Sequence, residues 1–254
     1  MSVLEVKNLQ KVYKSRFSSV SVEALRDVSF SVEEGDFVAI MGESGSGKTT
    51  LLNLLAVIDQ PTSGSILING KDASQIPSKA LSSFRRNHLG FVFQDYSLLN
   101  TFSIKDNILL PLVLNKTKAN EMEDRLKPIV DYLGLKSLLK KYPYEVSGGQ
   151  KQRAAAARAL ITNPELLLAD EPTGALDSSS SRELLELFSK LNHQGQTIVM
   201  VTHSVNAASY ASRVLFIRDG RIFHQLYRGD QSREAFYEQI TRSLSLLTTR
   251  EARA

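Results

Sequence analysis

The stretch "DFVAIMGESGSGKTT", residues 36–50, decides the fold of this chain. It begins with a short apolar run that ends in Gly42, which is typical of a buried β-strand. The residues from Gly42 onward match the pattern G-x-x-x-x-G-K-[ST], and the segment "TTLLNLLAVI" at 49–58 has the character of a helix. A strand, a glycine-rich turn and a helix in this order predict a phosphate-binding loop.

Each residue type in this loop has a physical reason to lie next to a phosphate. The glycines let the backbone turn tightly, so that successive N–H groups face phosphate oxygens. Lys48 supplies a positive charge for the β- and γ-phosphates, Thr49 offers a hydroxyl to Mg²⁺, and the positive end of the helix dipole faces the same anion. We therefore expect ATP and Mg²⁺ as cofactors, and we expect these loop residues to bind the nucleotide: Gly42, Ser44, Gly45, Ser46, Gly47, Lys48, Thr49 and Thr50.

A second stretch, "LLLADEP" at 166–172, supplies an acidic partner for the loop. Asp170 lies at the end of a predicted buried strand, where a carboxylate helps to hold Mg²⁺. Glu171 follows directly and is placed to orient or deprotonate the attacking water near the γ-phosphate. The alternative is a pair of acids that cap a strand or form salt bridges, and the phosphate-binding loop earlier in the chain favours the catalytic interpretation.

Two further polar residues follow predicted core strands. His203 ends "QTIVMVTH", and Gln94 ends "LGFVFQ". Strand ends of an α/β sheet bind ligands at one edge, so His203 is predicted to contact the γ-phosphate or to order Glu171 and the water. Gln94 is predicted to contribute its amide oxygen to Mg²⁺ or to the water. Taken alone, either residue would be an ordinary satisfied polar side chain.

The wider pattern predicts an α/β protein. Apolar strands alternate with helical segments before Gln94 and after Ile161, the residues between them are helical in character, and Asp219-Gly220 predicts a β-hairpin. We predict a single domain over 1–254. Its parts are a P-loop NTPase core at about 1–93 and 162–230, an inserted α-helical subdomain at about 94–161, and a C-terminal helical tail at about 231–254.

Composition narrows the possible functions. Hydrophobic residues make up 42% of the 254 and charged residues 23%, which is ordinary for a globular protein, and the absence of cysteine excludes disulfides. The net charge of +4 is dispersed, so we expect no nucleic-acid partner. The N-terminus has no signal-peptide pattern, and no apolar run approaches the roughly 20 residues of a membrane span, so we expect a soluble protein that reaches a membrane through a partner.

A second glycine-rich helix start occurs in "YEVSGGQKQRAAAARAL" at 144–160. Ser147 and the two glycines after it predict another anion site at a helix N-terminus. The alternative is an ordinary helix cap beside flexible glycines. A single ATP has one γ-phosphate, so two phosphate sites in one chain raise the question of what the second one binds.

The motifs "GESGSGKT", "FQ" at 93–94, "SGGQKQR" at 147–153, "LLLADEP" and "VTH" occur in the order found in ABC-transporter ATPases, and nearly the whole chain resembles that family. The resemblance implies an ABC ATPase architecture with a RecA-like core and an antiparallel β subdomain. It also implies that Tyr13 stacks on adenine and that two copies pair head to tail. In that pair the signature motif of one copy closes on the γ-phosphate held by the other, through Ser147, Gly149, Gln150 and the intersubunit-loop residue Asp177.

Further stretches such as "DEPTGALD" and "LAVIDQPTSG" resemble the lipoprotein-release and macrolide-export group, and "HLGFVFQDYSLLNT" and "AASYASRVLFIRDG" resemble the bacitracin-export type. One departure is Ser204, where that type commonly has Asp. The resemblance implies an ATPase on the inner face of the cell membrane, bound to an integral membrane permease that exports or displaces antimicrobial peptides, with a sensor histidine kinase as a further partner. The alternative is a complex of the lipoprotein-release or cell-division type, acting mechanically or in signalling without transport. "YSLLNTFSIKDNILLPL" at 96–112 is the predicted permease contact.

Overall fold

The computed structural model describes residues 2–14 and 21–251, with side chains described as far as residue 246. The end of the predicted helical tail, 252–254, lies outside the described residues. The elements follow one another in this order: β1 (Ser2–Lys14), β2 (Ser21–Glu33), β3 (Phe37–Met41), α1 (Lys48–Leu55), β4 (Ser63–Ile68), β5 (Lys71–Asp72), η1 (Ala73–Gln75), α2 (Ser78–His88), β6 (Leu89–Val92), α3 (Ile104–Leu114), α4 (Ala119–Tyr132), η2 (Lys136–Leu138), η3 (Pro143–Glu145), α5 (Gly148–Leu160), β7 (Leu166–Asp170), α6 (Ser178–His193), β8 (Thr197–Thr202), α7 (Val205–Ala208), β9 (Arg213–Arg218), β10 (Arg221–Tyr227) and α8 (Arg233–Glu251).

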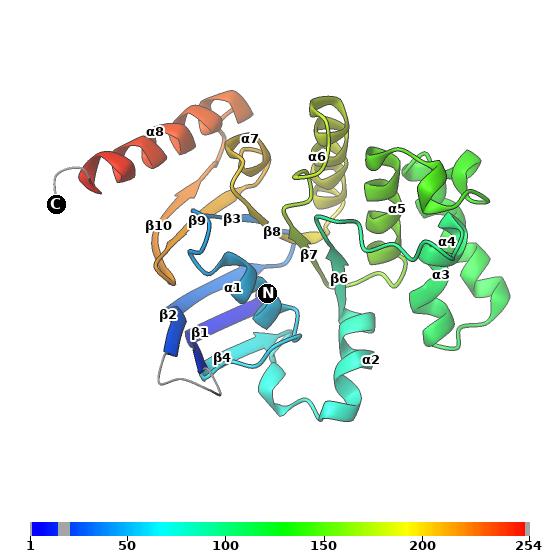
Figure 1. The fold of residues 1–254 in the computed structure, drawn as a ribbon, viewed down its shortest axis with the longest axis horizontal. Coiled ribbons are helices and arrows are strands. Elements are labelled where there is room, and N and C mark those ends of the chain that lie inside the picture. The colour runs from blue at the N-terminus through cyan, green and yellow to red at the C-terminus, as the bar shows by residue number, and fades with distance from the viewer. Residues whose placement is uncertain (1, 15–20, 252–254) are drawn as a thin grey trace.

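The central sheet has six strands in the order β10-β9-β3-β8-β7-β6 (Figure 1). β9, β3, β8, β7 and β6 run parallel, and only β10 is antiparallel to its neighbour. Because parallel strands end at the same edge of a sheet, the segments after β3, β6, β7 and β8 all emerge together. The phosphate-binding loop, Gln94, Glu171 and His203 belong to these four segments.

The strand before the phosphate-binding loop, β3, is buried along its whole length. Its side chains alternate between two hydrophobic cores, as the period of two in a strand requires. Phe37, Ala39 and Met41 face the core that holds most of the helices. Val38 and Ile40 face the second core, formed with α1 and the smaller sheet. β3 is therefore fixed on both faces, and the loop at its end starts from a rigid support.

The smaller sheet is antiparallel, with the order β2-β1-β4-β5. β1 pairs with both β2 and β4, and β4 pairs with the two-residue β5. This sheet is the predicted antiparallel β subdomain. Together with the parallel sheet and its helices it confirms the predicted α/β class.

Helices α3, α4 and α5 lie between β6 and β7 in the sequence and form a group at one end of the molecule, whereas α8 lies at the other end (Figure 1). The described part of α8 buries Phe236 and Ile240, so one face of the predicted helical tail packs against the core. None of the helices in the described residues combines the length and the apolarity that crossing a membrane requires.

The structure corrects two details of the sequence prediction. The helix after the phosphate-binding loop ends at Leu55 and does not continue to Ile58, because Val57 adopts a left-handed conformation with φ of 54°. Helix α2 was not predicted. It buries no residue fully, and its apolar contacts with the second core come from the partly buried Leu81 and Phe84.

Candidate active site

The phosphate-binding loop connects β3 to α1. The N-cap of α1 is Gly47, with φ of 102°, no side chain caps the helix, and its first turn contains no acidic residue. An α-helix leaves its first N–H groups without intrahelical acceptors, so this helix start offers free amide donors and the positive end of the dipole. This helix start is suited to bind an anion.

Two of the loop glycines are required by close contacts. A Cβ atom on Gly47 would lie 2.6 Å from the backbone oxygen of Ala24, and φ at Gly47 is positive. A Cβ on Gly42 would lie 2.2 Å from the backbone oxygen of Ile217. The loop is thus packed against β2 and β9, and no larger residue fits at either position.

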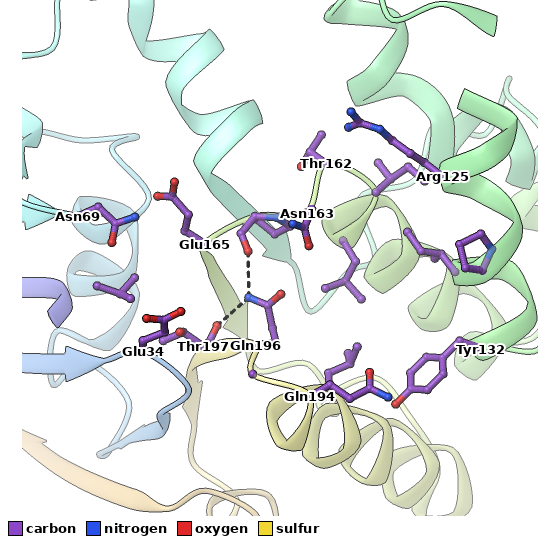
Figure 2. A pocket seen from close by; sticks show the side chains of 18 of the residues that line it. Glu34, Asn69, Arg125, Tyr132, Thr162, Asn163, Glu165, Gln194, Gln196 and Thr197 are labelled. Atoms are coloured by element: carbon purple, nitrogen blue, oxygen red, sulfur yellow. Dashed lines mark hydrogen bonds between the residues drawn. The ribbon is translucent and has the colours of Figure 1, made fainter. Parts of the chain in front are cut away.

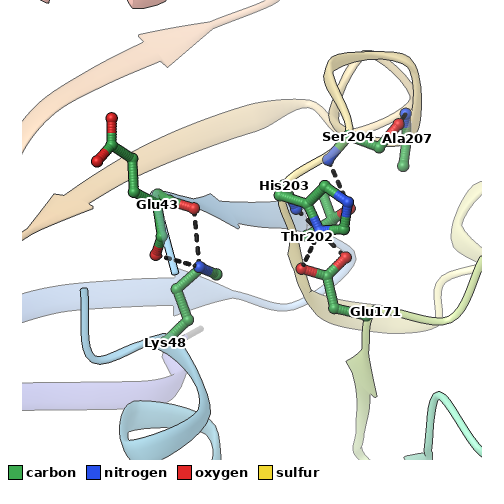
Figure 3. Close-up of polar contacts among 8 residues, drawn as sticks. Glu43, Lys48, Glu171, Thr202, His203, Ser204 and Ala207 are labelled. Carbon is green, nitrogen blue, oxygen red and sulfur yellow. Dashed lines mark hydrogen bonds and ion pairs between the residues drawn. The ribbon is translucent and has the colours of Figure 1, made fainter. Parts of the chain in front are cut away.

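Lys48 lies at the mouth of the loop and is 8% exposed. Its Nζ donates hydrogen bonds of 2.7 Å to the backbone oxygens of Gly42 and Glu43 (Figure 3). Burial lowers the pKa of Lys48, while the negative charges of Glu171 and Asp170 act in the opposite direction. The loop cation therefore lies within electrostatic reach of both predicted catalytic acids.

Asp170 is the last residue of β7. Burial raises the pKa of Asp170, the neighbouring Glu171 raises it further, and Lys48 lowers it. A partly buried carboxylate near a lysine suits Mg²⁺, which binds one or two protein oxygens and keeps water and phosphate as its other ligands. Asp170 and Thr49 are thus suitable ligands for the metal.

Glu171 adopts a left-handed conformation with φ of 43°. Its backbone N–H donates to the oxygen of Val201 on β8 at 2.9 Å, and its own carbonyl accepts from Gly174 at 2.9 Å. Non-glycine residues rarely adopt such a conformation, and they cluster at active sites. The backbone hydrogen bonds fix a strained turn from which the Glu171 side chain reaches the sheet edge.

His203 contacts Glu171 twice (Figure 3). Its Nδ1 lies 2.8 Å from Oε1 of the carboxylate, and its backbone N–H donates to Oε2 at 3.3 Å. The Glu171 side chain is 14% exposed, whereas the His203 side chain is 72% exposed. The imidazole thus covers a largely buried carboxylate from the solvent side, in agreement with the predicted ordering of Glu171 by His203.

Ser204, the departure noted in the sequence, caps the short helix α7. Its Oγ accepts a hydrogen bond of 3.2 Å from the N–H of Ala207, and its own N–H donates to Oγ1 of Thr202 at 3.0 Å. Serine and aspartate are comparably good N-caps, so Ser204 can cap α7 as an aspartate would at this position.

Gln94 lies two residues beyond the end of β6 and is exposed. Its side-chain amide packs on Gly174, where a Cβ atom would lie 2.8 Å from Nε2 of Gln94. Gln94 therefore touches the turn that begins at Glu171. The structure brings together, at one edge of the sheet, the four predicted groups: the loop with Lys48, the acids of β7, His203 and Gln94.

Tyr13 is at the edge of this region on β1. Its hydroxyl donates to Oδ2 of Asp59 at 2.9 Å, and Nζ of Lys11 lies 4.8 Å from the ring centroid. Burial raises the pKa of Tyr13, with Asp59 adding to the effect, and a hydrogen bond with Thr50 of α1 acts against it. One ring face is covered by Lys11, and the ring lies beside the helix that follows the phosphate-binding loop.

The signature-motif residues form the start of α5. Oγ of Ser147 accepts from the N–H of Gln150 at 3.3 Å, and Oε1 of Gln150 accepts from the N–H of Ser147 at 3.0 Å, which is a capping box. Gly149 packs against Ser180 of α6, where a Cβ would lie 2.6 Å from Oγ. The ordinary helix cap, which was the alternative to an anion site, is thus present. It does not use the N–H groups of Gly148 and Gly149, which can donate to another acceptor.

Asp177, predicted to cross between subunits, caps α6 within its own chain. Its Oδ1 accepts from the N–H groups of Ser179 and Ser180, each at 2.9 Å, and its Oδ2 accepts from Oγ of Ser180 at 2.7 Å. These hydrogen bonds lower the pKa of Asp177. Because Ser180 also packs against Gly149, the starts of α5 and α6 lie against each other.

A large cavity lies away from this edge. It measures about 1460 Å³ and lies at the amino ends of β7 and β8, lined by residues such as Glu165 and Thr197 (Figure 2). A smaller cavity of about 420 Å³ includes Glu171 and His203. The hydrogen bonds, backbone strain and charges described above gather at the edge that carries Glu171 and His203, whereas cavity size alone points to the opposite edge of the sheet.

Sequence reasoning missed Gln152 and Arg158, both on α5. Gln152 is fully buried, and its Nε2 donates to the backbone oxygens of Phe93 at 3.0 Å and Pro172 at 2.8 Å. Arg158 donates to the backbone oxygens of Tyr96 and Ser97. The available signal was a pair of polar residues on the buried face of an alanine-rich helix.

Comparison with known proteins agrees with this geometry. A family model described as ABC transporter matches residues 25–174. The chain is 52% identical over 247 residues to the ABC transporter ATP-binding protein YxdL of Bacillus subtilis, covering 97% of this chain and 95% of that protein. It is 48% identical over 248 residues to the bacitracin export ATP-binding protein BceA of Halalkalibacterium halodurans, covering 97% of each.

Among solved structures, the dimeric post-hydrolysis state of the ATP-binding cassette MJ0796 bound to ADP and Pi superposes with a TM-score of 0.80 at 36% identity. The match covers 88% of this chain and 98% of that one. The structural match therefore extends over most of this chain.

Proposed function

Because this chain belongs to the family of ABC transporter ATP-binding proteins, we propose that it powers a membrane permease that exports or displaces antimicrobial peptides. The family assignment makes it the ATP-binding subunit of an ABC transporter, an ATPase that binds ATP together with Mg²⁺. The observation that supports the peptide substrate is the 48% identity, over almost the full length of both chains, to a protein described as a bacitracin export ATPase.

Glu171 is the proposed general base. It lies beside the Mg²⁺ carboxylate Asp170, is largely shielded from solvent, and is oriented by His203. In this role Glu171 orients or deprotonates the attacking water, while His203 and Gln94 contact the γ-phosphate, the water or the metal. Lys48 and the loop amides stabilise the charge of the β- and γ-phosphates, and Thr49 and Asp170 hold the metal.

Adenine is proposed to stack on Tyr13. The ring belongs to β1 and interacts with Thr50 just after the phosphate-binding loop, so it lies on the side of the site where the base must emerge. Since Lys11 covers one ring face, the opposite face is the one available for the base.

A second copy of the chain is proposed to complete each ATP site in a head-to-tail dimer. The start of α5 is anion-binding in character, because the capping box uses the N–H of Gln150 and the N–H groups of Gly148 and Gly149 have no acceptor among the described residues. Ser147, Gly149, Gln150 and Asp177 then face the nucleotide of the partner. The similar structure of MJ0796 is dimeric with ADP and Pi, which supports this arrangement.

The permease is proposed to dock on a patch of four exposed apolar residues, Leu99, Phe102, Tyr142 and Tyr144. The segments that carry them are joined by a 2.8 Å hydrogen bond from the N–H of Ile104 to the oxygen of Lys141, and the two tyrosine rings stack at 5.5 Å. Exposed apolar patches of this kind mark interaction sites. The segment predicted to make this contact, 96–112, is thereby divided, because four residues of α3 belong to the core: Ile104, Ile108, Leu109 and Leu112.

Docking on this patch places the protein in the cytoplasm, on the inner face of the cell membrane, and a sensor histidine kinase is a further proposed partner through the permease. The test is peptide resistance of cells that express the chain together with a candidate permease. Wild-type cells are expected to tolerate a bacitracin-like peptide, and Glu171→Gln cells are expected to lose that tolerance. Unchanged tolerance in the mutant would contradict ATP-driven protection.

A matched pair of variants tests the docking patch. Tyr144→Glu places a charge on a side chain that is 70% exposed, and we expect the permease to co-purify less efficiently. Tyr237→Glu, at a 43% exposed tyrosine on α8, is the control and should keep the permease bound. Equal recovery of the permease with both variants would show that docking occurs elsewhere.

A further inference from the structure

Gln152 joins the two segments that carry the proposed catalytic residues. It lies on α5 with no exposed surface, and its Nε2 donates to the oxygen of Phe93 at 3.0 Å and to that of Pro172 at 2.8 Å. Phe93 directly precedes Gln94, and Pro172 directly follows Glu171. One amide group therefore connects the backbone on either side of the proposed water-binding site.

We propose that Gln152 is a positioning residue that holds Glu171 and Gln94 in register for ATP hydrolysis. This inference rests on the catalytic roles proposed above for those two residues. Gln152 itself touches neither nucleotide nor water. It acts through the backbone from inside the helical insertion, five positions after the start of the signature motif.

The turn after β7 depends on this hydrogen bond. Glu171 has a φ of 43°, a conformation that persists only when its surroundings hold it. The Glu171 amide is held by Val201, and its carbonyl by Gly174. Pro172 has no N–H, so its carbonyl is its one backbone hydrogen-bonding group, and Gln152 occupies that carbonyl. Gln152 therefore gives the middle of the strained turn a side-chain hydrogen bond.

The segment around Gln94 is held by the same helix at a second point. Tyr96 and Ser97 also adopt left-handed conformations, with φ of 64° and 45°, and both carbonyls accept hydrogen bonds from Arg158. Arg158 lies on α5, as Gln152 does. Helix α5 is thus hydrogen-bonded to the backbone on both sides of Gln94, and a displacement of α5 displaces Gln94 with it.

The chemistry of glutamine explains why this residue type is needed. Both neighbours of the side chain are carbonyl acceptors, so the NH₂ group must face them, and one NH₂ group carries two hydrogens for two carbonyls. Oε1 of Gln152 has no partner among the described residues, so the side chain serves as a donor. Methionine has a similar size and no donor, and an ionised glutamate would bring negative charge against two carbonyl oxygens.

Gln196 provides a matched control within the same chain. Its Nε2 also donates to two backbone carbonyls, those of Pro164 at 3.2 Å and Thr197 at 3.1 Å. It lies at the amino ends of the strands, in the large cavity at the edge opposite the catalytic residues (Figure 2). A glutamine-to-methionine change there removes the same type of hydrogen bonds far from the chemistry.

The experiment measures steady-state ATPase activity of the purified full-length protein. Gln152→Met is expected to lower kcat about tenfold to a hundredfold with KM for ATP within about twofold, since misplacing a catalytic group by about 1 Å has this effect. Gln196→Met is expected to lower Tm and to keep the wild-type kcat. A kcat for Gln152→Met equal to that of Gln196→Met would overturn the proposal.

A second variant keeps the test decisive if Gln152→Met does not fold. In Gln152→Glu, a protonated carboxyl donates to one carbonyl and an ionised one donates to none, so its kcat relative to wild type should rise as the pH falls from 8 to 6. A pH-independent ratio would overturn the proposal. Glu171→Gln in the same assay tests the premise separately, because wild-type turnover in that variant contradicts the catalytic roles and leaves the Gln152 results to be explained in another way.

Discussion

Both carboxylate oxygens of Glu171 are engaged by His203, Oε1 by the imidazole Nδ1 at 2.8 Å and Oε2 by the backbone N–H at 3.3 Å. Glu171 follows β7 and His203 follows β8, so the contact joins the ends of two neighbouring parallel strands. One bond comes from the backbone and persists in any side-chain variant, whereas the other depends on the imidazole. This division makes the contribution of the imidazole measurable.

His203→Ala is expected to lower kcat about tenfold or more while ATP binding is retained, because the Glu171 carboxylate loses one of the two hydrogen bonds that fix its orientation. Steady-state kinetics and nucleotide-binding titrations measure kcat and the affinity for ATP.

The control is Ser204→Asp, which preserves the N-cap of α7 and should keep Tm near the wild-type value. Ser204→Ala, by contrast, should lose about 1 kcal/mol of stability. Wild-type kcat in His203→Ala would contradict this role of the imidazole.

Glu171→Gln is expected to bind ATP, to lose turnover by at least about a hundredfold, and to accumulate as an ATP-bound dimer. The amide has nearly the same shape as the carboxylate but cannot accept a proton from water. Turnover is measured by phosphate release, and the dimer by native mass spectrometry with ATP and Mg²⁺. Hydrolysis at the wild-type rate would exclude Glu171 as the general base.

Asp170→Asn is expected to raise Tm of the nucleotide-free protein at neutral pH and to weaken Mg²⁺-dependent nucleotide binding. Burial and Glu171 hold the pKa of Asp170 above its ordinary value of 3.8 in the folded state. Below about pH 3.8 the acid is protonated in both states, and as the pH rises through the folded-state pKa the ionised form costs stability. The difference in Tm between Asp170→Asn and the wild type should therefore shrink as the pH falls towards 3.8. If Asp170→Asn melted at a lower temperature than the wild type at pH 7, ionised Asp170 would not be destabilising.

Ser147→Arg is expected to leave ATP binding by the isolated chain intact and to abolish the ATP-dependent dimer. The substitution introduces a long cation at the start of α5, where Ser147 and Gly149 are proposed to approach the partner's nucleotide. Dimerisation in the Glu171→Gln background is the readout, because that variant retains ATP. A dimer that persists with ATP would show that the second glycine-rich helix start is only a helix cap.

Sequence reasoning predicted the α/β class, the phosphate-binding loop between β3 and α1, and the hairpin at Asp219-Gly220. These features depend on local signals. Burial on both faces gives β3 a continuous apolar run, and Asp219 and Gly220 adopt φ of 48° and 73°, as a two-residue turn of type I′ requires. Local signals also placed Glu171 and His203 at strand ends, and the parallel register then brings these ends together.

The contacts within the site followed less directly from the sequence. Nothing in the residue types indicates that Tyr96 and Ser97 adopt left-handed conformations, because tertiary hydrogen bonds from Arg158 stabilise them. Gln152 was missed for a similar reason. Its two acceptors lie in segments distant in the sequence, and a glutamine in a helix is by default an exposed residue.

The neighbours of β3 in the sheet have a consequence for synthesis of the chain. β3 (Phe37–Met41) pairs only with β8 (Thr197–Thr202) and β9 (Arg213–Arg218), so the strand that carries the phosphate-binding loop has no hydrogen-bonded neighbour until residues near 197 have been made. Gly220, at the tip of the last hairpin, also donates to the oxygen of Ser46 in the loop at 3.1 Å. A nascent chain therefore completes its nucleotide site only after β8, β9 and the turn at Gly220 have been made, and a product that ends before them lacks the strands that support this loop.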